Sequence, residues 1–324
     1  MQVASAHKVR RWFMTFPRRQ SVLLLTVVLF IIFSILQPHT FLTESNLQSL
    51  LLSNAVSTLV ALAVLIPVVV GEFDLSVGYV VGFAAVIMAA LGGESHYSGP
   101  LALMIGLLIG TAIGTCNGVL VAKFKINSLI ATLGVGLAVS GLSVGASGSQ
   151  ILSTDIPSLF ASLARTSFLG LGLPVWIVLA LGAVMYWLFA FTPIGVKMYA
   201  TGGSARVARM AGVRTTSLKI AAFAAAGLIA AFAGAVQLGL SGAADPSFGS
   251  SLLLPAFAAV FLGSTTVRPG HFNVGGTLIA ILLLAVGFSG LSLEGVAFWT
   301  QPVFDGVVLI IGVLLSRSET RVAS

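Results

Sequence analysis

The chain has 324 residues, of which 57% are apolar or aromatic and only 8% are charged, and its mean hydropathy is +1.08. Soluble domains carry about 25% charged residues, so this composition excludes a water-soluble enzyme, a disordered chain and a nucleic-acid-binding protein. We therefore interpret the net charge of +7 as a topology signal beside a lipid bilayer. The single cysteine, Cys116, excludes an intramolecular disulfide and a thiolate metal cluster.

Ten apolar segments dominate the sequence. A bilayer core of about 30 Å requires roughly 20 apolar residues per helix, and we interpret each segment as a membrane-spanning helix. The eighth is short and is expected to be tilted, broken or extended into its flanks. The predicted fold class is all-α, a polytopic membrane protein of about ten transmembrane helices. The ten predicted spans are 20–37, 49–70, 76–92, 100–122, 128–147, 173–191, 219–240, 251–263, 275–291 and 299–315.

The basic residues orient these spans. If the N-terminal segment 1–19 is cytoplasmic, fifteen of the sixteen lysines and arginines fall on the cytoplasmic side, and only Arg165 falls outside. The positive-inside rule predicts such a bias. We therefore expect a transmembrane domain over 20–315, a cytoplasmic tail at 316–324, and a cytoplasmic loop at 192–218.

A short motif occurs twice. Residues 74–78 read Asp-Leu-Ser-Val-Gly before the third span, and residues 245–249 read Asp-Pro-Ser-Phe-Gly before the eighth. Each is followed within ten residues by Phe-Ala-Ala-Val, and the charge topology places the two copies on opposite sides of the membrane. This arrangement is typical of an inverted-topology repeat. The simpler interpretation, which stays open, is that Asp74 and Asp245 cap two helix starts.

A few polar side chains lie inside the predicted spans. They are candidates for lining a solute pathway, although such groups more often form interhelical hydrogen bonds. The glycines at every fourth position from Gly106 to Gly118 predict that the fourth span packs closely against another helix. The pathway candidates are Asn54, Ser57, Asn117 and Gln237.

Enzymatic interpretations find little support. The phosphate-binding pattern G-x-x-x-x-G-K-[ST] is absent, so the chain has no ATP site of that kind. Residues 145–148 and 287–290 match the G-x-S-G of intramembrane serine proteases, but all four histidines fall in predicted loops or termini, away from either serine. No two histidines share a helix face, which argues against a metal site. We expect no catalytic residue, no metal and no cofactor bound by this chain.

The loop at 192–218 has the pattern of a docking segment. After the glycine pair that ends at Gly203, Ser204 is placed to cap a short helix, and Gly212 is placed to end it. A short helix with apolar and basic faces, held between two spans, favours docking on a soluble partner. The alternative is an amphipathic loop lying on the membrane surface. The apolar face comprises Val207, Met210 and Ala211, with Arg206 and Arg209 beside it.

Residues 71–78, which read Gly-Glu-Phe-Asp74-Leu-Ser76-Val-Gly78, resemble the G-G-I-D-L-S-V-G of ribose-type ABC importer permeases. Glu72 and Phe73 replace the family's Gly and Ile, which adds a charge at a helix start. In the loop, Ala205 and Arg206 stand where the family often has Glu. Further segments that resemble the family are 114–122, 130–134, 192–212, 262–266 and 275–277.

The resemblance implies a permease that pairs with a second copy or a paralogue in the bacterial plasma (inner) membrane, with both termini cytoplasmic. Two cytoplasmic ABC ATPase subunits, or one fused tandem ATPase, would bind ATP and Mg. A periplasmic or lipid-anchored binding protein would deliver a monosaccharide or similar solute. The alternative is a stand-alone ion-coupled carrier or passive channel. The residues implied to contact the ATPase are Gly203, Ser204, Arg206, Arg209 and Gly212.

Overall fold

The computed structural model describes the backbone of residues 20–93, 97–297 and 299–322, and the side chains of these residues except 21 and 315–322. The predicted N-terminal segment 1–19 and the side chains of the predicted tail lie outside the described residues. The chain divides into two compact units: unit 2 is Leu51–Ala256, and unit 1 holds the residues before and after it.

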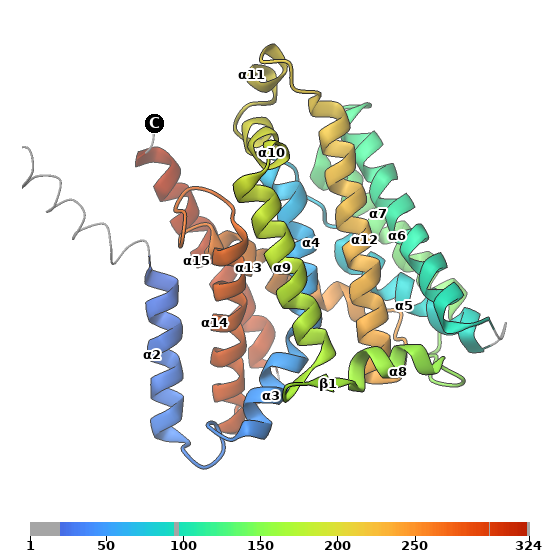
Figure 1. Ribbon diagram of the computed structural model, residues 1–324, viewed down its shortest axis with the longest axis vertical. Coiled ribbons are helices and arrows are strands. Elements are labelled where there is room, and N and C mark those ends of the chain that lie inside the picture. Colours follow the sequence, from blue (N-terminus) through green and yellow to red (C-terminus); the bar gives the residue numbers. More distant parts are fainter. Residues whose placement is uncertain (1–19, 94–96, 298, 323–324) are drawn as a thin grey trace, which may run out of the picture. The chain divides into compact units, whose positions relative to one another are not determined.

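Unit 2 is a bundle of helices with a two-stranded hairpin (Figure 1). Helices α10 and α11 lie at the same end as the start of α12, while α8 lies at the opposite end of α12. Two helices cross the unit boundaries: α3 (Glu44–Ser53) and α13 (Leu253–Gly263). The elements of unit 2 are α4 (Ala55–Val69), α5 (Val77–Gly93), α6 (Gly99–Ala122), α7 (Ser128–Ala146), α8 (Ser158–Arg165), β1 (Ser167–Phe168), β2 (Leu171–Gly172), α9 (Leu173–Phe191), α10 (Pro193–Gly203), α11 (Ala205–Met210), α12 (Thr215–Ser241) and η1 (Phe248–Leu252).

The core of unit 2 is built on α4 and α12. Every residue of α4 except Ser57 is buried, and α12 packs against α4, α5 and α6. A Cβ on Gly227 of α12 would lie 2.1 Å from the main-chain oxygen of Gly110 on α6. The hydrophobic effect does not drive helices together within lipid, so van der Waals contacts from close backbone approach stabilise their packing. The glycine stripe of α6 is therefore a helix-packing surface, as its spacing predicts.

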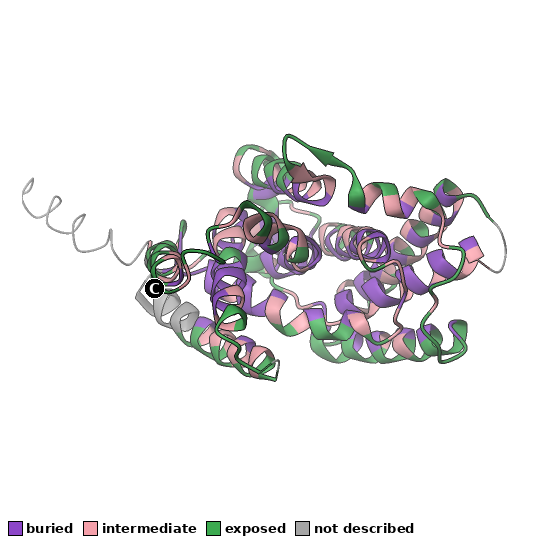
Figure 2. Ribbon diagram, turned by 90° about the horizontal axis from the view of Figure 1, so that it is seen from below, coloured by how far each residue is buried: buried purple, intermediate pink, exposed green. Residues whose placement is uncertain are grey.

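Within unit 2, the exposed residues lie on the helix faces that point away from the bundle (Figure 2). On α7, large apolar residues such as Leu133 and Leu137 are exposed, whereas Ala131 and Val139 are buried. An apolar exterior is what a helix needs where its surroundings are lipid.

Unit 1 contains α2 (Ser21–Leu36), α14 (Val274–Leu293) and α15 (Thr300–Val322). Helices α2 and α14 pack together, and the Phe33 ring lies directly over Gly290. A Cβ on Gly276 would lie 2.0 Å from the main-chain oxygen of Gly263. The two late glycine segments therefore meet backbone to backbone.

All ten predicted spans are helical in the described residues, and six helices are long and apolar enough to cross a membrane. The prediction of an all-α polytopic membrane protein is confirmed. The eighth predicted span is extended at its N-terminal side, because η1 begins at Phe248 and continues directly into α13. Extension into the flanks was one of the three alternatives expected for this short span. The six long helices are Glu44–Val69, Gly99–Ala122, Ser128–Ala146, Leu173–Phe191, Thr215–Ser241 and Val274–Leu293.

The sequence did not predict three elements: α8, the β1–β2 hairpin and α10. They lie outside the ten predicted spans and outside the short helix predicted after Ser204. Helix α8 has only eight residues; its Phe160 side chain is buried, and Gly239 of α12 packs against the main chain of Phe160. Helix α10 is capped by Thr192, whose hydroxyl accepts from the Gly195 N–H at 3.3 Å, and Pro193 occupies its first position.

Candidate functional site

The loop between α4 and α5 carries the first Asp-x-Ser-x-Gly motif, whose Asp74 and Ser76 are buried. Asp74 is 1% exposed, and its Oδ1 accepts hydrogen bonds from the Ser76 N–H at 2.9 Å and the Ser76 hydroxyl at 2.6 Å. Burial raises the pKa of the Asp74 carboxyl to about 6, although both hydrogen bonds from Ser76 oppose that rise. Asp74 therefore fixes the turn just before α5 rather than binding the N–H groups of the helix itself.

Two neighbouring helices hold this loop in place. Asn117 of α6 is fully buried, and its Nδ2 donates to the Ser76 hydroxyl at 2.7 Å. Among the described residues, Asn117 Oδ1 has no hydrogen-bond partner. On α7, the Thr132 hydroxyl accepts from the Leu75 N–H at 3.0 Å, and the Ser128 hydroxyl accepts from the Phe73 N–H at 3.3 Å. The polar groups of α6 and α7 thus position the loop.

The second motif copy repeats the first in detail. Asp245 Oδ1 accepts from the Ser247 N–H at 2.8 Å and from the Ser247 hydroxyl at 2.7 Å. The fifth residues of the two copies touch, because a Cβ on Gly249 would lie 2.0 Å from the main-chain oxygen of Gly78. The motifs are separated by about half the chain, yet their glycines form one backbone contact.

The predicted docking segment is seated on the end of α4. A Cβ on Gly202 would lie 2.2 Å from the main-chain oxygen of Val69, and one on Gly71 would lie 3.2 Å from Gly202 Cα. Gly71 also has φ +81°, which glycine adopts without strain. Gly203, by contrast, has no atom within 4 Å of a Cβ built on it. The first glycine of the pair therefore makes the contact between α10 and the end of α4.

Helix α11 has the caps and faces that the sequence predicts. The Ser204 hydroxyl accepts from the Val207 N–H at 3.4 Å, and Gly212 has φ +83° just after the helix. Val207 and Met210 are 64% and 83% exposed, while Ala208 is buried. Arg206 and Arg209 are exposed as well. An apolar pair beside two arginines is therefore free on the surface of unit 2.

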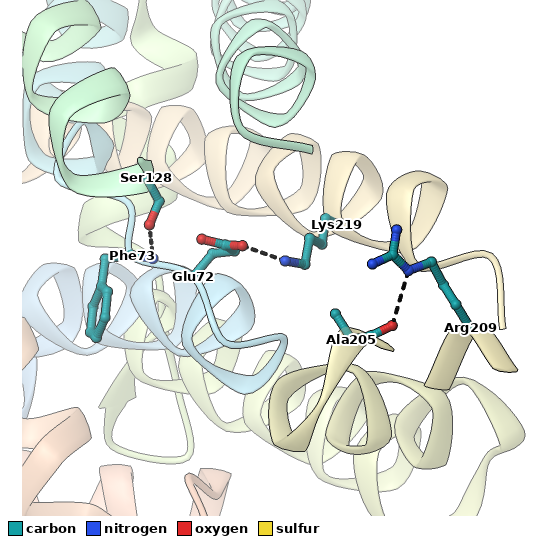
Figure 3. Close-up of polar contacts among 6 residues, drawn as sticks. All are labelled: Glu72, Phe73, Ser128, Ala205, Arg209 and Lys219. Atoms are coloured by element: carbon teal, nitrogen blue, oxygen red, sulfur yellow. Dashed lines mark hydrogen bonds and ion pairs between the residues drawn. The ribbon is translucent and has the colours of Figure 1, made fainter. Parts of the chain in front are cut away.

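Beside α11, unit 2 contains a cavity of about 460 Å³. Glu72 and Lys219 form an ion pair within it, joining the α4–α5 loop to the first turns of α12. Figure 3 shows these two side chains pointing toward one another, with the Arg209 guanidinium beyond Lys219. The sequence marked Glu72 as an extra charge but gave no partner for it. The only sequence signal for this ion pair was the charge topology, which places Glu72 and Lys219 on the same side of the membrane.

The remaining pathway candidates lie in the same unit. Asn54 and Ser57 are half-buried at the start of α4, where the helix is interrupted after α3. Gln237 is half-buried in α12, and its main-chain oxygen accepts from the Ser241 hydroxyl at 2.8 Å. Among the described residues, no group of three or more His, Cys, Asp or Glu is placed to hold a metal ion.

Comparisons with known proteins match most of the chain. A family model described as "Branched-chain amino acid transport system / permease component" matches residues 46–313. The chain is 36% identical over 295 residues to the ribose import permease protein RbsC of Bacillus subtilis. The matched region covers 90% of this chain and 91% of that protein.

Two other relatives have comparable coverage. The L-arabinose ABC transporter permease protein AraH of Azospirillum brasilense is 32% identical, covering 92% of this chain and 87% of AraH. The autoinducer 2 import system permease protein LsrC of Salmonella paratyphi B is 31% identical, covering 94% of this chain and 87% of LsrC. No solved structure matches the chain.

Proposed function

Because this chain belongs to the family of ABC importer permease components, we propose that it forms the membrane pathway for a monosaccharide or a similar small polar solute. Its relatives are named for ribose, L-arabinose and autoinducer 2. The solute is expected to belong to the same polar class, because the chain matches all three over nine-tenths of its length.

The observation that carries this proposal is the seating of the α10–α11 segment. One side of the segment contacts the end of α4 at Gly71, whereas Val207, Met210 and Arg209 face outward. A docking helix must combine a rigid attachment with a free face if it is to transmit movement. We propose that an ABC ATPase binds this face, and that ATP and Mg bind only to that partner. Two ATPase subunits, or one fused tandem ATPase, would serve a pair of permeases.

The contact between α10 and the end of α4 would link the ATPase to the solute pathway. Nucleotide-driven closure of the ATPases would move α10 and, through the glycine contact, the end of α4 and the α4–α5 loop that carries Asp74. Alternating access requires two states that nucleotide or solute favours unequally. Asn54, Ser57 and Gln237 are proposed to line the pathway. The complete burial of Asn117 favours a role in holding Ser76 over contact with solute.

The two motif copies support an inverted repeat. Both form the same Asp–Ser turn, and their glycines meet at Gly78 and Gly249. Equivalent residues of two elements related by a twofold axis meet where the axis passes between the elements, and the Gly78–Gly249 contact fits that arrangement. We propose that the four shorter apolar helices also cross the bilayer, giving ten spans. Both termini and the 192–218 loop would then be cytoplasmic, as the basic residues predict.

Charge reversal at Arg209 tests the proposed function. In the complex reconstituted with its ATPase and binding protein, Arg209→Glu is expected to abolish stimulation of ATP hydrolysis by the loaded binding protein. The variant should still reach the membrane, because Arg209 is exposed. Lys123→Glu, an exposed charge at the end of α6, is the matched control.

Two results would contradict the proposal. One is full coupling in Arg209→Glu. The other is solute uptake into liposomes by the permease alone, which would support the stand-alone carrier or channel.

A further inference from the structure

The cavity beside α11 has a strongly basic lining. Three cationic side chains, Lys125, Arg209 and Lys219, line it together with one carboxylate, Glu72. Lys219 is paired with Glu72, and among the described residues Lys125 and Arg209 form no ion pair. The cavity therefore has two positive charges that no carboxylate among the described residues of unit 2 neutralises.

Hydrogen-bond donors in the cavity are also free. Arg209 donates through Nε to its own helix, to the Ala205 oxygen at 3.2 Å, which leaves its terminal N–H groups available. Thr215 is 4% exposed and lines the cavity, yet its hydroxyl has no partner within the described part of the chain. This hydroxyl is reached through the cavity, since the fully buried unpartnered side-chain atoms of the described residues are Asn117 Oδ1 and Ser143 Oγ. It is therefore available to donate to a ligand oxygen.

The start of α12 adds a further positive contribution. Helix α12 begins at Thr215 on the cavity wall, and its preceding residue, Arg214, makes no capping hydrogen bond through its side chain. The first N–H groups of a helix and its dipole favour an anion at this end. At the adjacent start of α7, the Asn127 side chain already accepts from the Leu129 and Ile130 N–H groups. The anion-binding end is therefore that of α12.

We propose that this cavity binds a phosphate group. Its volume of about 460 Å³ lies within the range of ligand sites, about 300–1,000 Å³, and accommodates a phosphate with an attached polar headgroup. Arginine and lysine bind phosphate oxygens through short charge-assisted hydrogen bonds.

The surroundings indicate where such a phosphate could come from. The lining residues Lys125 and Leu129 have exposed apolar neighbours in the sequence, Phe124 at 65% and Ile130 at 70%. These side chains can lie against acyl chains, and basic pockets at the ends of membrane helices are suited to anionic lipid headgroups. Phosphatidylglycerol and free inorganic phosphate share the required chemistry, and the experiment separates them.

The test measures ligand binding by the full-length permease alone, without ATPase, so that its outcome is independent of the proposed transport function. Native mass spectrometry in neutral detergent compares phosphatidylglycerol, phosphatidylcholine and inorganic phosphate. Wild type is expected to bind phosphatidylglycerol about tenfold more tightly than phosphatidylcholine. Lys125→Gln should remove most of that preference, and Thr215→Val should weaken binding by about threefold. Lys123→Gln, a nearby lysine that does not line the cavity, should behave as wild type.

Each other outcome is informative. Binding of inorganic phosphate that depends on Lys125, without a preference for phosphatidylglycerol, would keep the phosphate site and identify free phosphate as its ligand. Equal affinity for both lipids with no phosphate binding would overturn the proposal. Equal losses in Lys123→Gln and Lys125→Gln would also overturn it, because general surface charge would then explain the effect. If Lys125→Gln left lipid and phosphate binding unchanged and, in a separate pull-down, weakened ATPase association, the cavity would be a protein contact and the proposal would be overturned.

Discussion

The contact between the two motif glycines yields a quantitative prediction for Gly249→Ala. The new Cβ would lie 2.0 Å from the Gly78 oxygen and 2.8 Å from the Gly82 nitrogen. Ordinary van der Waals contact begins near 3.4 Å, so the deficit against the oxygen exceeds 1 Å. Both neighbouring atoms belong to the backbone and cannot rotate away. Segment η1 must therefore shift from α5.

Overpacking in a tightly packed core costs about 1–3 kcal/mol. We expect a loss near the upper end, about 3 kcal/mol, because no side chain can absorb the displacement. Gly78→Ala should cost a similar amount, since its Cβ would lie 2.4 Å from the Gly249 oxygen. The double variant should lose less than the sum, because the first methyl group already separates the segments.

Thermal or denaturant unfolding of the purified permease in detergent measures this loss, with solute uptake as the functional readout. Gly141→Ala is the matched control, because this glycine lies within α7 and has nothing within 4 Å of its built Cβ. It should be neutral or stabilising by up to about 1 kcal/mol, from helix propensity alone. If Gly249→Ala were as stable as Gly141→Ala, the two motifs would not be in contact and the argument for a symmetric pair would fail.

Two further predictions concern the α4–α5 loop and the ion pair that Glu72 forms with Lys219. Asp74→Ala should lower the free energy of unfolding by about 1–3 kcal/mol, because it removes the acceptor of two Ser76 hydrogen bonds. Asp74→Asn retains an acceptor oxygen and should lower it by less than about 1 kcal/mol. Both losses are measured by unfolding near pH 7. Burial raises the pKa of Asp74 to about 6, so the free energy of unfolding should fall as pH rises through 6. If Asp74→Asn showed the same pH dependence as wild type, Asp74 would not be its source. A double-mutant cycle of Glu72→Gln and Lys219→Gln should give a coupling energy of about 1 kcal/mol that decreases at high salt. The control cycle of Glu72→Gln and Lys123→Gln should give no coupling energy.

Much of the fold was predictable because its signals are local. Apolar runs of about 20 residues located the helices, since each such run satisfies its own backbone within lipid. Ser204 and Gly212 marked the ends of α11, because capping depends on residues a few positions away. The eight-residue helix α8 was missed, since a segment so short is stable only through its packing, in this case through Phe160.

The candidate site was predicted only in part. The sequence identified Asn117 as a polar group in a span but left its partner open, and the structure pairs it with Ser76, 41 positions away. It identified a glycine pair before α11 but did not indicate that Gly202, rather than Gly203, contacts the end of α4. Both questions depend on which faces of two helices meet, and helical periodicity does not specify the partner.

By itself, the sequence determined that this chain is a membrane protein, where most of its helices lie, and which loop carries a capped amphipathic helix. These properties follow from hydropathy and capping, which act over one or two helical turns. Only the tertiary structure decided that the motif glycines meet, and that Glu72 pairs with Lys219, 147 positions away, beside a basic cavity. Such contacts form when separate helices pack at close range, and their energies depend on ångström-scale distances that no local pattern encodes.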